Sequence, residues 1–226
     1  MKQDALSKRW ERYARTDAEF YIWVDVARGD DFAASGERDA ADILALCRPY
    51  LSQNGLAVEI GCGVGRLAIP MSREFDRVVG VDIAPTMLRK LAQAGERSAV
   101  SNVVGMLAHE GWDLQGPIDF AYSHIVLQHI EDWALIDAYF ARVARALGPG
   151  GVFYAQFDTR SPNTFYRLRH LLPDAVLPRN PRRGIRRIRR HVPAVERLTK
   201  RHGFVTEQML GAGSERTILV LRRRSA

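Results

Sequence analysis

Hydrophobic residues recur along the chain with two alternating spacings. Short apolar runs that are typical of buried strands lie at 56–60, 77–83, 102–107, 118–125, 152–157, 204–210 and 216–222. Apolar stripes at helical spacing lie at 4–15, 37–51, 66–75, 85–95 and 133–147, and "GPGG" is predicted to close the last of them. The alternation predicts a parallel sheet with helices on both faces. The final two strands flank "GAGS" and predict an antiparallel hairpin at one side.

A chain of 226 residues has the length of one domain, and its 46% hydrophobic residues are enough for a core. We therefore expect one globular domain over residues 1–226. No apolar run approaches the roughly 20 residues that cross a bilayer, and "MKQDALSKRW" lacks the apolar centre of a signal peptide. Two cysteines without a CxxC pair favour a reducing compartment and disfavour a metal site. We therefore expect a cytoplasmic protein without a membrane partner and without a metal.

The positive charge is concentrated in one segment. The chain carries a net charge of +7, yet residues 160–202 hold 13 Lys/Arg against only Asp174 and Glu196. Four prolines argue against one long helix over 160–191, which we expect to be a basic insertion that caps the acceptor site. Its arginines could hold an anionic group on a small substrate, contact nucleic-acid phosphates, or form a solvated surface.

The stretch "VEIGCGVGR", residues 58–66, joins the first predicted strand to the next helix. Glycines at 61, 63 and 65 let a ligand lie against the main chain at the carboxyl edge of the sheet. A dinucleotide would need a third glycine where Arg66 stands. The carboxylate of Glu59 would repel a pyrophosphate but accept a cationic amine and sulfonium. The pattern therefore favours S-adenosylmethionine over NAD.

Four segments together resemble the class I S-adenosylmethionine-dependent methyltransferases: "VEIGCGVGR", "VVGVDIAPTML", "IDFAYSHIVLQHIEDW" and "RALGPGGVF". The resemblance covers residues 40–158 well and 192–222 more loosely. It implies a Rossmann-like, doubly wound, seven-stranded sheet. It also implies methyl transfer to a hydroxyl or amine of a small-molecule acceptor, with specialised metabolism as one setting. The N-terminal "W…FAASGE" is similar to a bacterial subgroup that acts on small molecules.

The resemblance also assigns cofactor-binding roles to residues near the strand ends. Asp82 would accept the ribose hydroxyls and Glu59 would face the methionine amine. The remaining implied residues are Gly61, Gly63 and Gly65 in the turn, Cys62 as a small packing residue, Ile83 and Met87 beside the adenine, Glu110 with Gly111 and Trp112 at the adenine amine, and Ser123 near the methionine moiety. Asp113 competes with Glu110 for the adenine amine.

Two histidines follow the fourth predicted strand. His124 and His129 are the candidate general bases, because imidazole exchanges protons near neutral pH. Either could instead only orient a loop. The aromatic residues of segment 1–36 predict a helical lid over the pocket, with an ordinary helix packed on the sheet as the alternative. Arg66 could pair with an acid of the N-terminal region.

Two other functions stay open. An RNA or DNA methyltransferase could use the arginine-rich cap, although "SHIV" replaces the Asn/Asp-Pro-Pro-aromatic run of enzymes that methylate exocyclic base amines. A non-catalytic cofactor-binding or scaffolding protein could keep the same fold. The presence of Glu59, Asp82 and the three glycines argues against that second alternative.

Overall fold

A computed structural model describes residues 2–22, 31–109, 117–172, 185 and 187–223. Seven strands form one sheet in the order β3-β2-β1-β4-β5-β7-β6. The strands are β1 (Leu56–Ile60), β2 (Arg77–Asp82), β3 (Val103–Leu107), β4 (Ile118–Ser123), β5 (Leu147–Phe157), β6 (Phe204–Leu210) and β7 (Thr217–Arg223). β1 to β5 pair in parallel, and β7 lies antiparallel between β5 and β6. The predicted mixed α/β sheet is confirmed.

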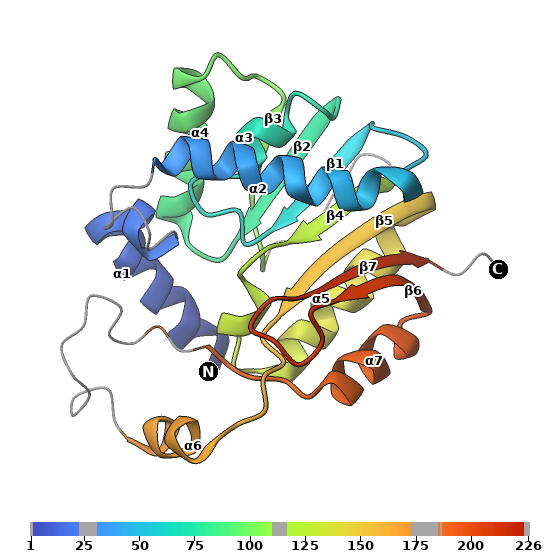
Figure 1. The fold of residues 1–226 in the computed structure, drawn as a ribbon. Coiled ribbons are helices and arrows are strands. Elements are labelled where there is room, and N and C mark those ends of the chain that lie inside the picture. Colours follow the sequence, from blue (N-terminus) through green and yellow to red (C-terminus); the bar gives the residue numbers. More distant parts are fainter. Residues whose placement is uncertain (1, 23–30, 110–116, 173–184, 186, 224–226) are drawn as a thin grey trace.

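Helices cover both faces of this sheet (Figure 1). The described helices are α1 (Lys2–Ile22), α2 (Phe32–Cys47), α3 (Ala68–Met71), α4 (Pro85–Arg97), α5 (Trp133–Ala146), α6 (Thr164–Leu171) and α7 (Val192–Arg201), with short 3-10 turns η2 (Arg48–Tyr50) and η3 (Leu127–His129). Buried residues of α5 and α7 pack on one face, and those of α2, α3 and α4 pack on the other. Each face is therefore closed by the apolar stripe of its helices.

Element boundaries differ from the sequence prediction at several places, and the first helix, predicted over 4–15, spans Lys2–Ile22. α2 begins at Phe32, because the side chain of Asp31 accepts hydrogen bonds from the amides of Ala33 and Ala34 and caps the helix. The predicted helix over 66–75 is only four residues of α3. "GPGG" does not close a helix; it lies inside β5, which begins at Leu147.

The first helix, α1, is fastened to the end of β2 and the start of α4. Ser7 Oγ donates to the carbonyl of Ile83 at 2.8 Å. Glu11 accepts from the backbone amide of Thr86 at 3.0 Å and from its hydroxyl at 2.5 Å, which satisfies a donor at the N-terminus of α4. These bonds hold α1 beside the carboxyl ends of the strands (Figure 1). Within the described residues, no helix is long and apolar enough to cross a membrane.

Candidate functional site

The glycine turn after β1 wraps over the end of β2. Gly61, Gly63 and Gly65 have φ angles of 77°, 55° and 93°, which side-chain-bearing residues rarely adopt. The amide of Gly61 donates to the carbonyl of Val81 at 2.7 Å, and that of Gly63 donates to Asp82 Oδ2 at 2.9 Å. The turn therefore brings bare backbone next to the carboxylate that ends β2.

A pocket of about 900 Å³, its open mouth included, lies at the carboxyl ends of β1, β2 and β4, where the strand order reverses. The expected site residues that line it are Glu59, Gly61, Cys62, Gly63, Asp82, Ile83, Met87, His124 and His129. Leu6, Trp10, Tyr21 and Ile22 of α1 form part of its wall. The pocket thus gathers residues from segments far apart in the sequence.

Several expected residues lie elsewhere. A β-carbon at Gly65 would meet Leu91 at 2.4 Å, so this glycine faces α4 and serves packing. Ser123 is fully buried, and its hydroxyl donates to the carbonyl of Ile60 at 3.3 Å. Cys62 is buried, and its sulfur occupies the space that a β-carbon at Gly80 would need. This position fits the packing role expected for it. Glu110, Gly111 and Trp112, together with Asp113, lie outside the described residues.

Glu59 is a buried carboxyl group on the pocket wall. Strand pairing places it opposite Tyr122, whose hydroxyl donates to it at 3.2 Å. Burial raises the pKa of Glu59 to about 8, although the Tyr122 hydrogen bond and the charge of Arg66 act in the opposite direction. A proton therefore occupies this carboxyl group near neutral pH until a positive charge approaches it.

Asp82 is the second buried carboxyl group of the pocket. Its two oxygens accept from the amides of Gly63 and Ala84, each at 2.9 Å. Burial raises its pKa, and these backbone hydrogen bonds oppose that rise. Because each carboxylate oxygen can accept more than one hydrogen bond, Asp82 keeps capacity for a ligand that presents hydroxyl groups.

A buried polar network connects α2 to the pocket. Arg66 donates to Asp39 at 2.6 Å, and Nε2 of His124 lies 3.4 Å from the same carboxylate. The other ring nitrogen, Nδ1, lies 3.2 Å from the hydroxyl of Tyr154. Burial alone would raise the pKa of Asp39, but His124 and Arg66 lower it to about 2. The acid that pairs with Arg66, left unnamed by the sequence, is therefore Asp39.

The two candidate bases differ in their surroundings. Burial lowers the pKa of His124, and both of its ring nitrogens are engaged by Asp39 and Tyr154. His129 ends η3, where its ring lies 6.1 Å from that of Trp10 in α1. Ile125, which directly follows His124, has a φ of 59°. This conformation is uncommon for a β-branched residue and is found at functional sites.

Gly36 lets α2 approach the backbone of Arg66. A β-carbon at this position would lie 2.1 Å from the carbonyl oxygen of Arg66. We expect Gly36→Ala to lower the free energy of unfolding by about 1–3 kcal/mol, because backbone atoms must move apart. Chemical denaturation would measure this loss. Gly95→Ala in α4 is the control, since its nearest atom is 3.3 Å away and helices favour alanine. Equal stability of the two variants would contradict the contact.

The basic segment was expected to cap the acceptor site, and the structure describes its residues 160–172, 185 and 187–191. Arg160 and Arg187 both pair with Glu215 at 3.1 Å, and Arg160 also pairs with Asp158. Arg190 donates to the carbonyls of Ile130 and Glu131 at 2.8 and 2.9 Å. These arginines therefore hold the protein's own groups, which weakens the expectation that they bind an anionic acceptor.

No group of three or more described His, Cys, Asp or Glu side chains could hold a metal ion.

The curated proteins that resemble this chain align with about half of its length. A ubiquinone biosynthesis O-methyltransferase of Methylobacterium sp. (strain 4-46) is 34% identical over 110 residues, which are 48% of this chain and 43% of that one. The same-named protein of Mesorhizobium japonicum is 30% identical over 58% of this chain and 50% of its own length. The chain thus spans about half the length of the curated relatives that it matches.

Solved structures match over most of the chain at low identity. An S-adenosylmethionine-dependent methyltransferase from Clostridium acetobutylicum has a TM-score of 0.67 and 16% identity, with 90% of this chain and 97% of that one covered. The CcbJ methyltransferase from Streptomyces caelestis has a TM-score of 0.67 and 17% identity, with 96% and 99% covered. Both show the fold.

A family model described as a methyltransferase domain matches residues 32–208, which is more than half of the chain. This span contains β1 to β5, the glycine turn and the pocket residues of the sheet. With the strand order and the two buried carboxyl groups in place, the chain belongs to the methyltransferase domain family and has the fold of the class I S-adenosylmethionine-dependent methyltransferases.

Proposed function

We propose that this protein transfers a methyl group from S-adenosylmethionine to a hydroxyl group of a small organic acceptor. The observation that carries the proposal is the pair of buried carboxyl groups, Glu59 and Asp82, on either side of the glycine turn. The curated relatives named O-methyltransferases favour oxygen over nitrogen as the acceptor atom.

The residues of the pocket fit this cofactor. Neither Glu59 nor Asp82 makes a salt bridge with any other described residue, and burial without such a partner raises the pKa of both carboxyl groups. The ammonium group of the cofactor would supply that partner to Glu59, and its ribose hydroxyls would donate to Asp82. Ile83 and Met87 provide apolar contacts on the same wall. When bound, S-adenosylmethionine supplies an activated methyl group on sulfur.

The remaining residues position the acceptor and accept its proton. We assign the base role to His129, which lines the pocket beside Trp10, whereas the two ring nitrogens of His124 face Asp39 and Tyr154. Nε2 of His129 lies 3.4 Å from the side-chain nitrogen of Gln128. Trp10, Tyr21 and Ile22 of α1 line the same pocket, so this helix would exclude water from the reacting groups. This role is that of the lid expected from segment 1–36.

The direct test combines binding and turnover. Isothermal calorimetry should detect binding of S-adenosylmethionine. Mass spectrometry should detect a methylated product, about 14 Da heavier than the acceptor, from at least one member of a panel of phenols, catechols and aliphatic alcohols. Binding of NAD in place of S-adenosylmethionine would contradict the proposal. Cofactor binding with no product from any acceptor would favour the non-catalytic alternative.

The RNA or DNA alternative has a separate test. Nucleic-acid binding releases counterions, so its affinity falls steeply with salt. The pairing of Arg160, Arg187 and Arg190 within the protein argues against it. Tight RNA binding with a steep salt dependence, together with methylated RNA, would make this alternative the better one.

Cofactor binding should depend on pH through Glu59. Because burial places the pKa of this carboxyl group at about 8, it is protonated below that pH and must ionise when the cofactor's ammonium approaches. Affinity should therefore rise about tenfold per pH unit from pH 6 to 8 and then level off. Calorimetry in buffers of different ionisation enthalpy should show one proton released per cofactor at pH 6–7.

The matched variant for this prediction is Glu59→Gln. It keeps the shape and the Tyr122 contact but has no proton to release, so binding should be weaker at pH 8 and independent of pH. The same pH slope in the wild type and in this variant would show that another group titrates.

A further inference from the structure

Helix α6 carries an apolar face that is exposed in the part of the chain that the structure describes. The exposed fractions of Phe165, Leu168 and Leu171 are 72%, 56% and 81%, and that of Leu172, just past the helix, is 38%. At about 100° per residue, these side chains fall within an arc of roughly 120° on one side of the helix. Figure 1 shows α6 set apart from the sheet and from the helices that cover it. Large apolar side chains gathered in this way mark an interaction surface.

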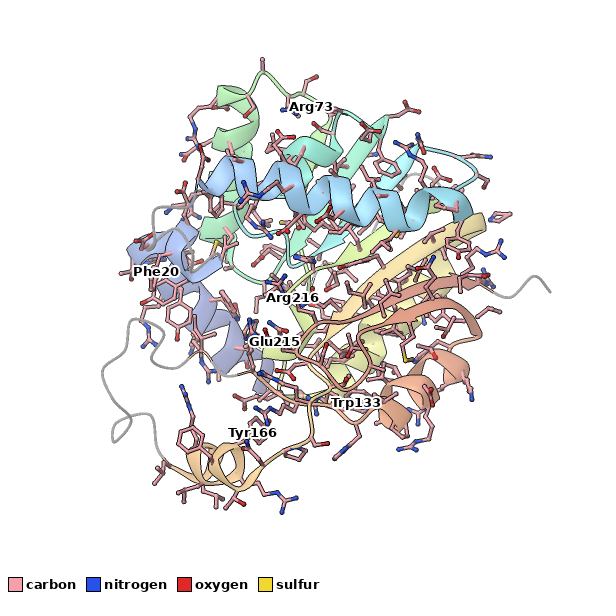
Figure 2. All side chains as sticks on the ribbon, in the orientation of Figure 1. Phe20, Arg73, Trp133, Tyr166, Glu215 and Arg216 are labelled. Carbon is pink, nitrogen blue, oxygen red and sulfur yellow. The ribbon has the colours of Figure 1, made fainter. Side chains whose placement is uncertain are left out.

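The opposite side of α6 is the one that holds it to the protein. Tyr166 projects toward the rest of the molecule (Figure 2), and its hydroxyl accepts from the amide of Arg189 at 3.0 Å. The guanidinium of Arg189 lies 4.4 Å above the Tyr166 ring. The start of the helix is capped by Asn163, which accepts from the Tyr166 amide at 2.8 Å. The apolar arc therefore points outward because the polar side is fastened inward.

Positive charge flanks the apolar arc on both sides. Arg167 and Arg169 are exposed and bracket the arc on the helix circumference. The sequence has no acidic residue between Asp158 and Asp174. A short helix with an apolar face and flanking arginines matches the interface of an anionic bilayer, where apolar side chains enter below the headgroups and arginines pair with phosphates.

Other occupants fit this surface less well. A second copy of the chain, packed through the same face, would bring the arginines of both copies together. Nucleic acid would meet Arg167 and Arg169 but would leave three exposed aliphatic side chains without a partner. Only a surface that is apolar beneath an anionic layer complements both features.

We propose that the α6 face formed by Phe165, Leu168, Leu171 and Leu172 docks this protein on an anionic membrane surface. The expectation of no membrane partner rests on the lack of a spanning segment, whereas surface docking needs only a few inserted side chains. The docking does not rest on the proposed methyl transfer.

The docking face is connected to the pocket. Ile188, next to the Arg189 that holds α6, donates its amide to the carbonyl of Gln128 at 2.6 Å. Gln128 lies in η3 and directly precedes His129, which lines the pocket. Docking through α6 would thus place the pocket near the bilayer. If the proposed function holds, the acceptor class that this geometry favours is a lipid-soluble molecule with a hydroxyl group near the headgroups.

The test is co-sedimentation of the full chain with vesicles. The wild type should bind vesicles of 70% phosphatidylcholine and 30% phosphatidylglycerol at least tenfold more strongly than pure phosphatidylcholine. The triple variant Phe165→Ser, Leu168→Ser, Leu171→Ser should lose at least tenfold in binding. Its matched control is Val104→Ser, Val205→Ser, Leu210→Ser, which removes exposed apolar side chains from β3 and β6 and should bind as the wild type does.

The charge is tested separately. Arg167→Gln with Arg169→Gln should weaken binding to the anionic vesicles by a factor of about five for each arginine. Arg97→Gln with Lys200→Gln makes the same charge change on exposed residues of α4 and α7 and should have little effect. Circular dichroism and cofactor calorimetry should match the wild type in all four variants.

Four results would overturn the docking proposal. The first is equal binding of the wild type to neutral and anionic vesicles, and the second is full vesicle binding by the triple variant. The third is self-association of the wild type in sedimentation velocity, lost in the triple variant, when the wild type does not bind vesicles. The fourth is binding of the wild type to RNA but not to vesicles. Vesicle binding without methyl transfer would contradict only the proposed function, and methyl transfer without vesicle binding would contradict only the docking.

Discussion

Replacement of His129 by glutamine should lower kcat for a hydroxyl acceptor by about 10²–10⁴-fold and leave cofactor affinity almost unchanged. A positioned general base contributes rate enhancements of this size, and glutamine cannot take up the acceptor's proton. His129 lines the pocket beside Trp10 of α1. Single-turnover kinetics with saturating cofactor would measure the chemical step directly.

Two further variants give this experiment its controls. His202→Gln changes a histidine that lies 3.1 Å from Asp137, outside the described pocket, and should keep wild-type kcat. His124→Asn should act mainly through stability and acceptor KM, because it breaks the contacts to Asp39 and Tyr154. A loss of this size in kcat should appear only in His129→Gln. An unchanged kcat in His129→Gln would show that solvent accepts the acceptor's proton. A loss of kcat in His124→Asn alone would show that His124 is the base.

Replacement of Asp82 by alanine should weaken S-adenosylmethionine binding by about 10²–10⁴-fold. Two hydrogen bonds to a carboxylate, at roughly 1.5–3 kcal/mol each, account for this range. Alanine also leaves the amides of Gly63 and Ala84 without the acceptor that orders the turn. Asp82→Asn keeps one oxygen acceptor and should lose less. Isothermal calorimetry is the measurement.

The control for lost backbone hydrogen bonding is Asp119→Ala. Asp119 accepts from the amide of Leu56 at 2.9 Å, at the opposite end of β1. Its removal should lower stability without changing cofactor affinity. Unchanged affinity in Asp82→Ala would remove this residue from the site, and an equal loss in Asp119→Ala would show that the effect is only structural.

The strands and the glycine turn could be predicted from sequence because their signals are local. An apolar run such as 77–83 is buried on both faces wherever the sheet places it, and φ angles near those of Gly61 and Gly63 favour glycine in any context. The strand that runs through "GPGG" was missed, because β5 keeps pairing across a bulge opposite Ile118 that no local pattern reveals.

The polar network of the site could not be predicted in the same way. Asp39, Arg66, His124 and Tyr154 come from four separate segments, and only the packing of α2 on the sheet brings them together. Asp39 sits in the middle of a helix, where an acid ordinarily signals a solvated face. The elevated pKa of Glu59 likewise depends on complete burial, which the sequence of β1 suggests but cannot measure.

The attachment of α1 to Ile83 and Thr86 has a kinetic consequence. Ile22 of this helix lies so close to the glycine turn that a β-carbon at Gly63 would meet it at 2.6 Å. We expect a molecule that rests on that turn to contact this helix, so that the bonds of Ser7 and Glu11 slow its release. We therefore expect the residence time of a molecule in the pocket to depend on how often α1 moves away from the strand ends.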